Sequence, residues 1–167
     1  MLAINTKKHF VEIDELPEWF NAKVKLHTVD ANTDVTPHGA ILNLFSTKSY
    51  NLVRFDIPEF HKKLAQLLTE HKYDVVQLEG LFLSMYIATI RKHSTALVSM
   101  RGHNVEYLIW ERLAASTGSF FKKKYLQLLA KRLKREEISA LQELDCIVPI
   151  SEVDAQLYQQ QGAKVPM

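Results

Sequence analysis

Three turns of the sequence carry polar side chains directly after an apolar run. The apolar runs are DVVQL (74–78), ALVSM (96–100) and CIVPI (146–150). Because ligands bind beyond the carboxyl ends of the strands in an open parallel sheet, the residues after each run are candidates for ligand contact. The candidate substrate-binding residues are Glu79, Gly80, Arg101, Gly102, Asn104, Ser151 and Glu152, and the candidate catalytic residue is His103.

The segment RGHN (101–104) has two readings. We expect Asn104 to be the N-cap of the helix that follows, and Gly102 permits a tight or left-handed turn, so a capped helix start explains both residues. That reading does not require His103, which is either a solvated loop histidine or a ligand contact beside exposed helix N–H groups. Arg101 either pairs with Glu79 across neighbouring turns or binds a ligand.

Several other kinds of site find little support. Glu79 has no partner carboxylate at a defined spacing, which argues against a two-carboxylate glycosidase. The seven histidines and single cysteine, Cys146, show no metal-ligand spacing. The five glycines form neither a GxGxxG fingerprint nor a Walker A loop. We therefore expect no metal and no cofactor.

A run of basic residues on the longest predicted helix allows three interpretations. Most such runs are a solvated face, and docking on an anionic membrane surface is the sharper alternative. Nucleic acid binding is the third interpretation. We expect no nucleic acid partner, because the sequence has neither a base-recognition motif nor a basic sheet that carries aromatic residues. The basic residues are Lys122, Lys123, Lys124, Lys131, Arg132, Lys134 and Arg135.

Length and composition favour one globular domain spanning residues 1–167. Apolar residues make up 47% of the chain, charged residues 24%, and the net charge is +2. The start does not resemble a signal peptide, and no apolar stretch reaches the ~20 residues of a membrane span. We expect a cytoplasmic protein, with peripheral attachment to the inner face of the membrane as an option through the basic helix.

Strand-like and helical segments alternate along the chain, which predicts an α/β fold. We expect a Rossmann-like, mostly parallel sheet with helices on both faces. The predicted strands are 2–5, 24–29, 74–78, 96–100, 146–150 and 164–167. The predicted helices are 57–71, 81–93, 120–144 and 151–162, with a short helix at 38–46 and another after Asn104. We expect Ser151 to be the N-cap of the helix 151–162, because Asp154 follows three residues later.

Three segments together resemble the N-terminal domain of bacterial glycosyltransferase family 4 enzymes of the GT-B fold. They are DVVQLEGLF (74–82), IRKHSTALVSMRGHNVEYLIWERLA (90–114) and ALQELDCIVPISEVDA (140–155). The resemblance implies an acceptor-side domain that faces a separate domain holding the nucleotide-sugar donor. It also implies that His103 contacts the donor sugar near the reacting centre, and that transfer to a carbohydrate or lipid-linked acceptor retains the anomeric configuration.

The family's glycine-rich loop after the first strand has no counterpart in this sequence. By the resemblance, the chain is a fragment that lacks the first βα unit and the donor-binding C-terminal domain, and it is inactive alone. We then expect a sheet without a central strand, filled by self-association, filled by a rearranged strand or left open. The alternative is a stand-alone α/β binding or regulatory module, or a peripheral membrane-binding module, in which the strand-end residues only cap helices.

Overall fold

The computed structural model describes all 167 residues and has a Rossmann-like α/β fold. The strands are β1 (Leu2–Thr6), β2 (His27–Ala31), β3 (Val75–Glu79), β4 (Leu97–Gly102) and β5 (Cys146–Pro149). The α-helices are α1 (Glu18–Asn21), α2 (Pro37–Leu44), α3 (Tyr50–Val53), α4 (Pro58–Glu70), α5 (Ile87–His93), α6 (Glu106–Ser116), α7 (Phe120–Leu141) and α8 (Glu152–Gln160). The 3₁₀ turns are η1 (Lys7–His9), η2 (Ile13–Glu15) and η3 (Leu81–Tyr86).

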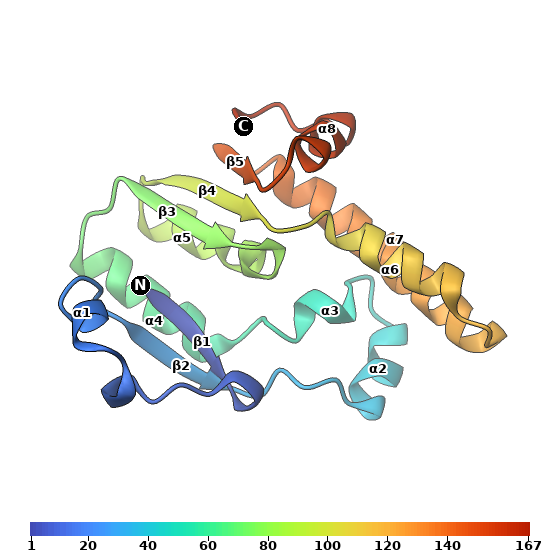
Figure 1. Ribbon diagram of the computed structural model, residues 1–167, viewed down its shortest axis with the longest axis horizontal. Helices are drawn as coiled ribbons and strands as arrows, with labels where there is room; N and C mark the ends of the chain where they lie inside the picture. The colour runs from blue at the N-terminus through green and yellow to red at the C-terminus, as the bar shows by residue number, and fades with distance from the viewer.

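The strands form two separate parallel sheets. One has the order β1-β2 and the other β3-β4-β5. In Figure 1, β1 lies between β2 and β3, and the arrows of these strands point in the same direction. The predicted parallel arrangement is confirmed, but no ladder joins β1 to β3.

The core lies on one face of the three-stranded sheet. Leu78, Val98 and Ile147 are buried there in a cluster with side chains of α4, α5 and α7. Side chains alternate between the faces of a strand, so their neighbours point the other way. On that opposite face Val75, Leu97 and Val148 remain 52%, 57% and 44% exposed.

Several element boundaries differ from the prediction. The predicted helix 81–93 is divided into η3 and α5. At the end of η3 the buried Tyr86 hydroxyl donates to the carbonyl of Phe55 and accepts the N–H of Ile57 at 3.2 Å, which ties this turn to the start of α4. The predicted strand 24–29 begins only at His27, because residues 20–24 form hydrogen-bonded turns after α1.

The end of the chain is not a strand, contrary to the prediction for residues 164–167. The segment does lie beside β5, since the N–H of Ile147 donates to the carbonyl of Pro166 at 3.0 Å. Helices α6 and α7 pack side by side as a long hairpin (Figure 1). None of the helices has the combination of length and apolar composition that crossing a membrane requires.

Candidate functional site

The ends of β3 and β4 bring together the predicted residues Glu79, Arg101 and His103. Glu79 and Arg101 are aligned partners in the parallel ladder, and His103 follows two residues later. Arg101 Nη2 lies 3.4 Å from Glu79 Oε1, and His103 Nε2 lies 3.4 Å from Glu79 Oε2. The predicted pair between Arg101 and Glu79 is therefore confirmed, and the same carboxylate lies beside the imidazole of His103.

A fourth residue, Gln77, belongs to this cluster and was not predicted. Its side-chain amide donates to Glu79 Oε1 at 2.6 Å. Gln77 lies two residues before Glu79 and therefore on the same face of β3. This alternation of side chains along a strand was the signal in the sequence that could have identified Gln77. The charged side chains of the cluster are about half exposed. Exposed ion pairs of this kind are worth at most about 1 kcal/mol, so the cluster adds little to the stability of the fold.

The two glycines at these strand ends play different roles. Gly80 has φ +96°, a conformation that favours glycine, and a Cβ there would lie 3.6 Å from His103 Cδ2. Gly102, expected to permit a tight or left-handed turn, has no positive φ and ends β4. A Cβ on Gly102 would lie 2.5 Å from the hydroxyl of Tyr158. Close packing against this buried tyrosine, and not turn geometry, therefore requires glycine at position 102.

The prediction that Asn104 caps the following helix is wrong. Helix α6 begins at Glu106 with Val105 at the N-cap, and no side chain of its own caps it. The Asn104 side chain is exposed, and its carbonyl accepts the Tyr158 hydroxyl at 2.8 Å. The N–H groups of Glu106 and Tyr107 donate instead to the two carboxylate oxygens of Glu137, at 3.1 and 3.2 Å.

Glu137 is a fully buried carboxyl group on α7, 0% exposed. Burial raises the pKa of Glu137 to about 7, although the hydrogen bonds from the N–H groups of Tyr107 and Glu106 favour its charged form. The expectation that exposed N–H groups of α6 serve a ligand at this strand end is therefore corrected, because two of them are bonded to this carboxylate. Glu137 stands four residues after Leu133 and therefore on the same buried face of α7. This spacing was the signal in the sequence that could have identified Glu137.

Ser151 and Glu152 lie beyond β5 at the same edge of the sheet, since β5 runs parallel to β4. As predicted, Ser151 is the N-cap of α8: its hydroxyl oxygen accepts the N–H of Asp154 at 3.1 Å and donates to Asp154 Oδ2 at 2.6 Å. Glu152 is exposed in the first turn of α8. Neither residue bonds to the cluster around Glu79, so the structure brings together the predicted residues of β3 and β4 but not those that follow β5.

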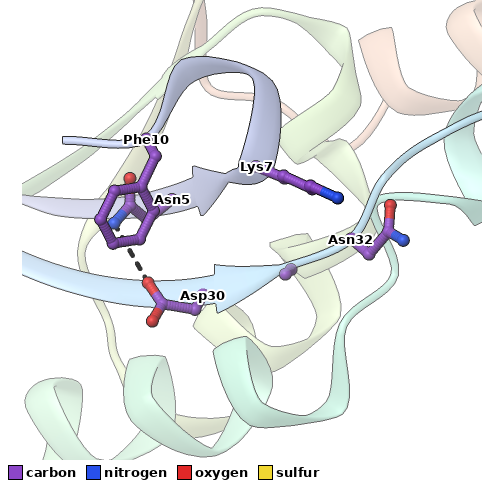
Figure 2. Close-up of a pocket in the computed structure, with 6 residues that line it drawn as sticks. Asn5, Lys7, Phe10, Asp30 and Asn32 are labelled. Carbon is purple, nitrogen blue, oxygen red and sulfur yellow. Dashed lines mark hydrogen bonds between the residues drawn. The ribbon is translucent and has the colours of Figure 1, made fainter.

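A hollow of about 460 Å³ lies at the carboxyl ends of β1 and β2 (Figure 2). Asn5 supports it: its amide nitrogen donates to Asp30 Oδ1 at 3.1 Å and to the carbonyl of Val11 at 3.2 Å. These bonds hold in place the loop that carries Lys7 and Phe10. The lining residues are Asn5, Lys7, Phe10, Asp30, Ala31 and Asn32.

Figure 2 shows the Lys7 side chain extending toward Asn32, and Lys7 forms no ion pair. This hollow was not predicted, because the strand-end rule was applied only to the three later strands. The same rule applied to the runs at 2–5 and 24–29 points to the residues that follow them, Lys7 and Asn32 among these.

The basic residues of α7 divide into two groups. Arg132 donates to the carbonyls of Asn43 and Leu44 at 2.8 and 3.0 Å, and Arg135 donates to the carbonyl of Thr47. Lys134 lies 4.6 Å from the ring centroid of Tyr107. Lys124 Nζ lies 5.8 Å from the ring centroid of Phe120. No side-chain hydrogen bond or ion pair to the protein is formed by four lysines: Lys122, Lys123, Lys124 and Lys131.

No group of three or more His, Cys, Asp or Glu side chains lies close enough together to hold a metal ion. Comparisons with protein-family models, with curated proteins and with solved structures gave no match.

Proposed function

We propose that this chain is the acceptor-side domain of a retaining glycosyltransferase that works in the cytoplasm. In this proposal a second domain holds most of the nucleotide-sugar donor, and the sugar passes to a carbohydrate or lipid-linked acceptor. The support is the resemblance of residues 74–82, 90–114 and 140–155 to glycosyltransferase family 4, together with the Rossmann-like fold.

The observation that carries the proposal is the presentation of His103 at the carboxyl end of β4. Glu79 Oε2 lies 3.4 Å from its Nε2, and Gly80 lies beside its ring. The imidazole thus lies beside a carboxylate and is about half exposed, so it is accessible to a hydroxyl group of a sugar. An acceptor hydroxyl that attacks beside the departing phosphate needs no protein nucleophile, and none is predicted from the sequence.

The negative charge of the departing phosphate needs a different partner from the one expected. Glu137 accepts the N–H groups of Glu106 and Tyr107, so these do not stabilise an anion from a substrate. Arg101 is the cation of this chain at the same strand ends, and it is about half exposed. We assign the phosphate contact of this domain to Arg101.

The hollow at the ends of β1 and β2 is the place we assign to the acceptor. Phe10 offers an apolar ring, and Lys7 and Asn32 offer hydrogen-bond donors, a combination that suits a hydroxylated ring. Saturation-transfer NMR on the chain with methyl hexosides tests this assignment. Signals that fall in the Asn32→Ala variant, and stay in a His71→Ala control outside the hollow, would support it.

The test of the catalytic assignment is a sugar-transfer assay on a longer protein that joins residues 1–167 to a donor-binding domain. We expect His103→Ala to lower kcat by about 10²–10³, the usual effect of losing one positioned polar contact to the transition state. Thermal melting should be unchanged, since the His103 side chain is half exposed. His71→Ala, at the opposite end of the sheet, is the control; wild-type turnover in His103→Ala would exclude a catalytic role.

The chain alone should transfer no sugar and bind UDP-glucose or GDP-mannose weakly at best. The alternative is a stand-alone α/β binding or regulatory module without catalysis. A natural reading frame that stops after Met167 would favour that alternative, and one that continues for roughly a further domain would favour the transferase.

The start of α7 favours docking on an anionic membrane as a second role. Lys122, Lys123 and Lys124 lie next to Phe120 and Phe121, which are 66% and 84% exposed. Exposed aromatic residues beside cations suit a lipid interface. Co-sedimentation with phosphatidylserine vesicles should fall with salt and in a Lys122/Lys123/Lys124→Gln variant, while a Lys72→Gln control should bind like wild type.

A further inference from the structure

The two sheets present open edges to each other. In Figure 1 the strands follow the order β2, β1, β3, β4 and β5, with all arrows in one direction. In the doubly wound order 3-2-1-4-5-6 the first strand of one half lies inside the sheet, beside the first strand of the other half, where the strand order reverses. That central position lies between β1 and β3, where no strand pairs with either edge.

The hydrogen-bond pattern identifies the backbone groups that face this position. The Asp74 carbonyl and the Gly80 N–H form hydrogen bonds with β4. Because backbone groups alternate in direction along a strand, the residues at odd positions of β3 point their N–H and C=O groups away from β4 and toward β1. On β3 these are Val75, Gln77 and Glu79. The Met1 carbonyl bonds to β2, which leaves the backbone groups of Leu2, Ile4 and Thr6 on β1 facing the same position.

The surroundings of this position are apolar. Leu2, Ile4 and Val76 are only partly buried and pack against the core on one face. On the other face Val75 and Leu97 are 52% and 57% exposed. A strand between β1 and β3 would cover the first group, and a helix across the sheet would cover the second.

We propose that the position between β1 and β3 binds one further parallel β-strand, apolar on both faces, which belongs to a strand–helix unit. Connections are right-handed, so those running from β3 to β4 to β5 place their helices on one face. A connection that runs in the opposite direction, from the added strand toward β1, places its helix on the other face. That face carries the exposed Val75, Leu97 and Val148. This inference does not depend on the proposed function.

The test uses the 167-residue chain and a designed peptide with an apolar strand of about five residues, a glycine turn and an amphipathic helix of roughly twelve. Hydrogen exchange should be fast at the N–H groups of Ile4, Gln77 and Glu79 in the chain alone. With the peptide, free or tethered to Met1 by a Gly/Ser linker, exchange there should slow at least tenfold. The thermal melting temperature should also rise.

Proline variants provide a matched pair. Gln77→Pro removes an N–H that faces the proposed strand but makes no bond to β4, and proline is tolerated on edge strands. Thr28→Pro removes the equivalent N–H on the outer edge of β2, where no strand is proposed. Gln77→Pro should abolish the protection of Ile4 by the peptide, and Thr28→Pro should leave it intact.

Two results would overturn the proposal. One is the absence of protection with both the free and the tethered peptide. The other is protection of the same N–H groups in the chain alone together with a dimer in light scattering, which would assign the position to a second copy. If circular dichroism shows that Gln77→Pro does not fold, the proposal is decided by whether the peptide slows hydrogen exchange in the wild-type chain.

Discussion

Two helices that follow neighbouring strands of one sheet are capped in opposite ways. Helix α8, after β5, is capped within its own first turn: Ser151 accepts the N–H of Asp154 at 3.1 Å. Helix α6, after β4, has no such side chain, and Glu137 of α7 accepts the first N–H groups from about 30 residues away. Both arrangements satisfy backbone donors that the helix itself leaves free.

The difference shows which features a sequence reveals by short-range pattern. A serine three residues before an acidic residue is a local signal, and it correctly located the start of α8. The cap of α6 depends on the packing of α7 against it, so the same local reasoning selected Asn104 wrongly. The remote cap has a chemical cost as well, because it buries a carboxyl group and raises its pKa to about 7.

The largest effect should follow removal of the remote cap. Glu137→Ala leaves the N–H of Tyr107 without a partner in a buried place and creates a cavity, so we expect the free energy of unfolding to fall by about 3 kcal/mol. Urea unfolding at pH 7 measures it. Glu143→Ala, an exposed acidic position near the end of α7, should change stability by less than about 0.5 kcal/mol. Equal, small losses in both variants would remove Glu137 as the cap.

The remote cap should also make stability depend on pH, in a direction fixed by the raised pKa. The pKa of Glu137 is about 7 in the folded chain and about 4.3 in an unfolded one. Between these values the folded state holds more protons, so the free energy of unfolding falls as pH rises, by at most on the order of 3 kcal/mol. In Glu137→Gln this component should vanish.

Asp145 contributes with the opposite sign. The N–H of Val98 and then the guanidinium of Arg91 lower the pKa of Asp145, so its stabilisation is lost as pH falls through the acidic range. Asp145 is present in both wild type and Glu137→Gln, and the difference between their urea titrations isolates Glu137. Superimposable pH profiles would contradict the assignment.

A third prediction concerns the contact that links the two helix starts. Gly102 ends β4 against Tyr158 of α8, whose buried hydroxyl bonds to the carbonyl of Asn104. Gly102→Ala puts a Cβ 2.5 Å from that hydroxyl, and we expect a loss of about 2 kcal/mol. Gly118→Ala has no atom within 4 Å of its added Cβ and no positive φ, so it should be neutral or slightly stabilising in thermal melts. A neutral Gly102→Ala would show that Tyr158 moves freely.

The local cap should be worth less than the remote one. Ser151→Ala removes the acceptor of the Asp154 N–H at an exposed helix start, so we expect a loss of about 1 kcal/mol in urea unfolding. Ser151→Asn keeps a side-chain acceptor at the N-cap and should retain most of the stability. If Ser151→Asn loses as much as Ser151→Ala, a feature of serine other than capping is responsible.

The parallel α/β fold was predictable because strand and helix signals are periodic and local. The runs at 74–78 and 96–100 have no helical period, and their ends correctly placed Glu79 beside Arg101. The absence of hydrogen bonding between β1 and β3 depends on strands that are far apart in the sequence. Only the family resemblance suggested it. The split of 81–93 depends on Tyr86 reaching Phe55 and Ile57, a contact across about 30 residues that no short-range pattern contains.

The candidate site was predictable to the same extent. Strand-end logic found Glu79, Arg101 and His103, and alternation along β3 would have added Gln77. The same logic was not extended to the first two strands, so the hollow with Lys7 and Asn32 was missed. That Arg132 and Arg135 bind backbone carbonyls around α2 was beyond sequence reasoning, because those carbonyls approach α7 only in the fold.

The smallest expected effect gives the sharpest contrast between the two helices. A side chain that caps a helix costs about 1 kcal/mol when replaced by alanine, and Asn104 is the residue that local pattern selects as the cap of α6. Its side chain is exposed and makes no hydrogen bond, while its carbonyl, which alanine keeps, accepts the Tyr158 hydroxyl. Asn104→Ala should therefore change the free energy of unfolding by less than about 0.5 kcal/mol. Measured beside Ser151→Ala in the same urea series, a loss of equal size would mean that Asn104 caps α6 and that the bonds to Glu137 contribute little.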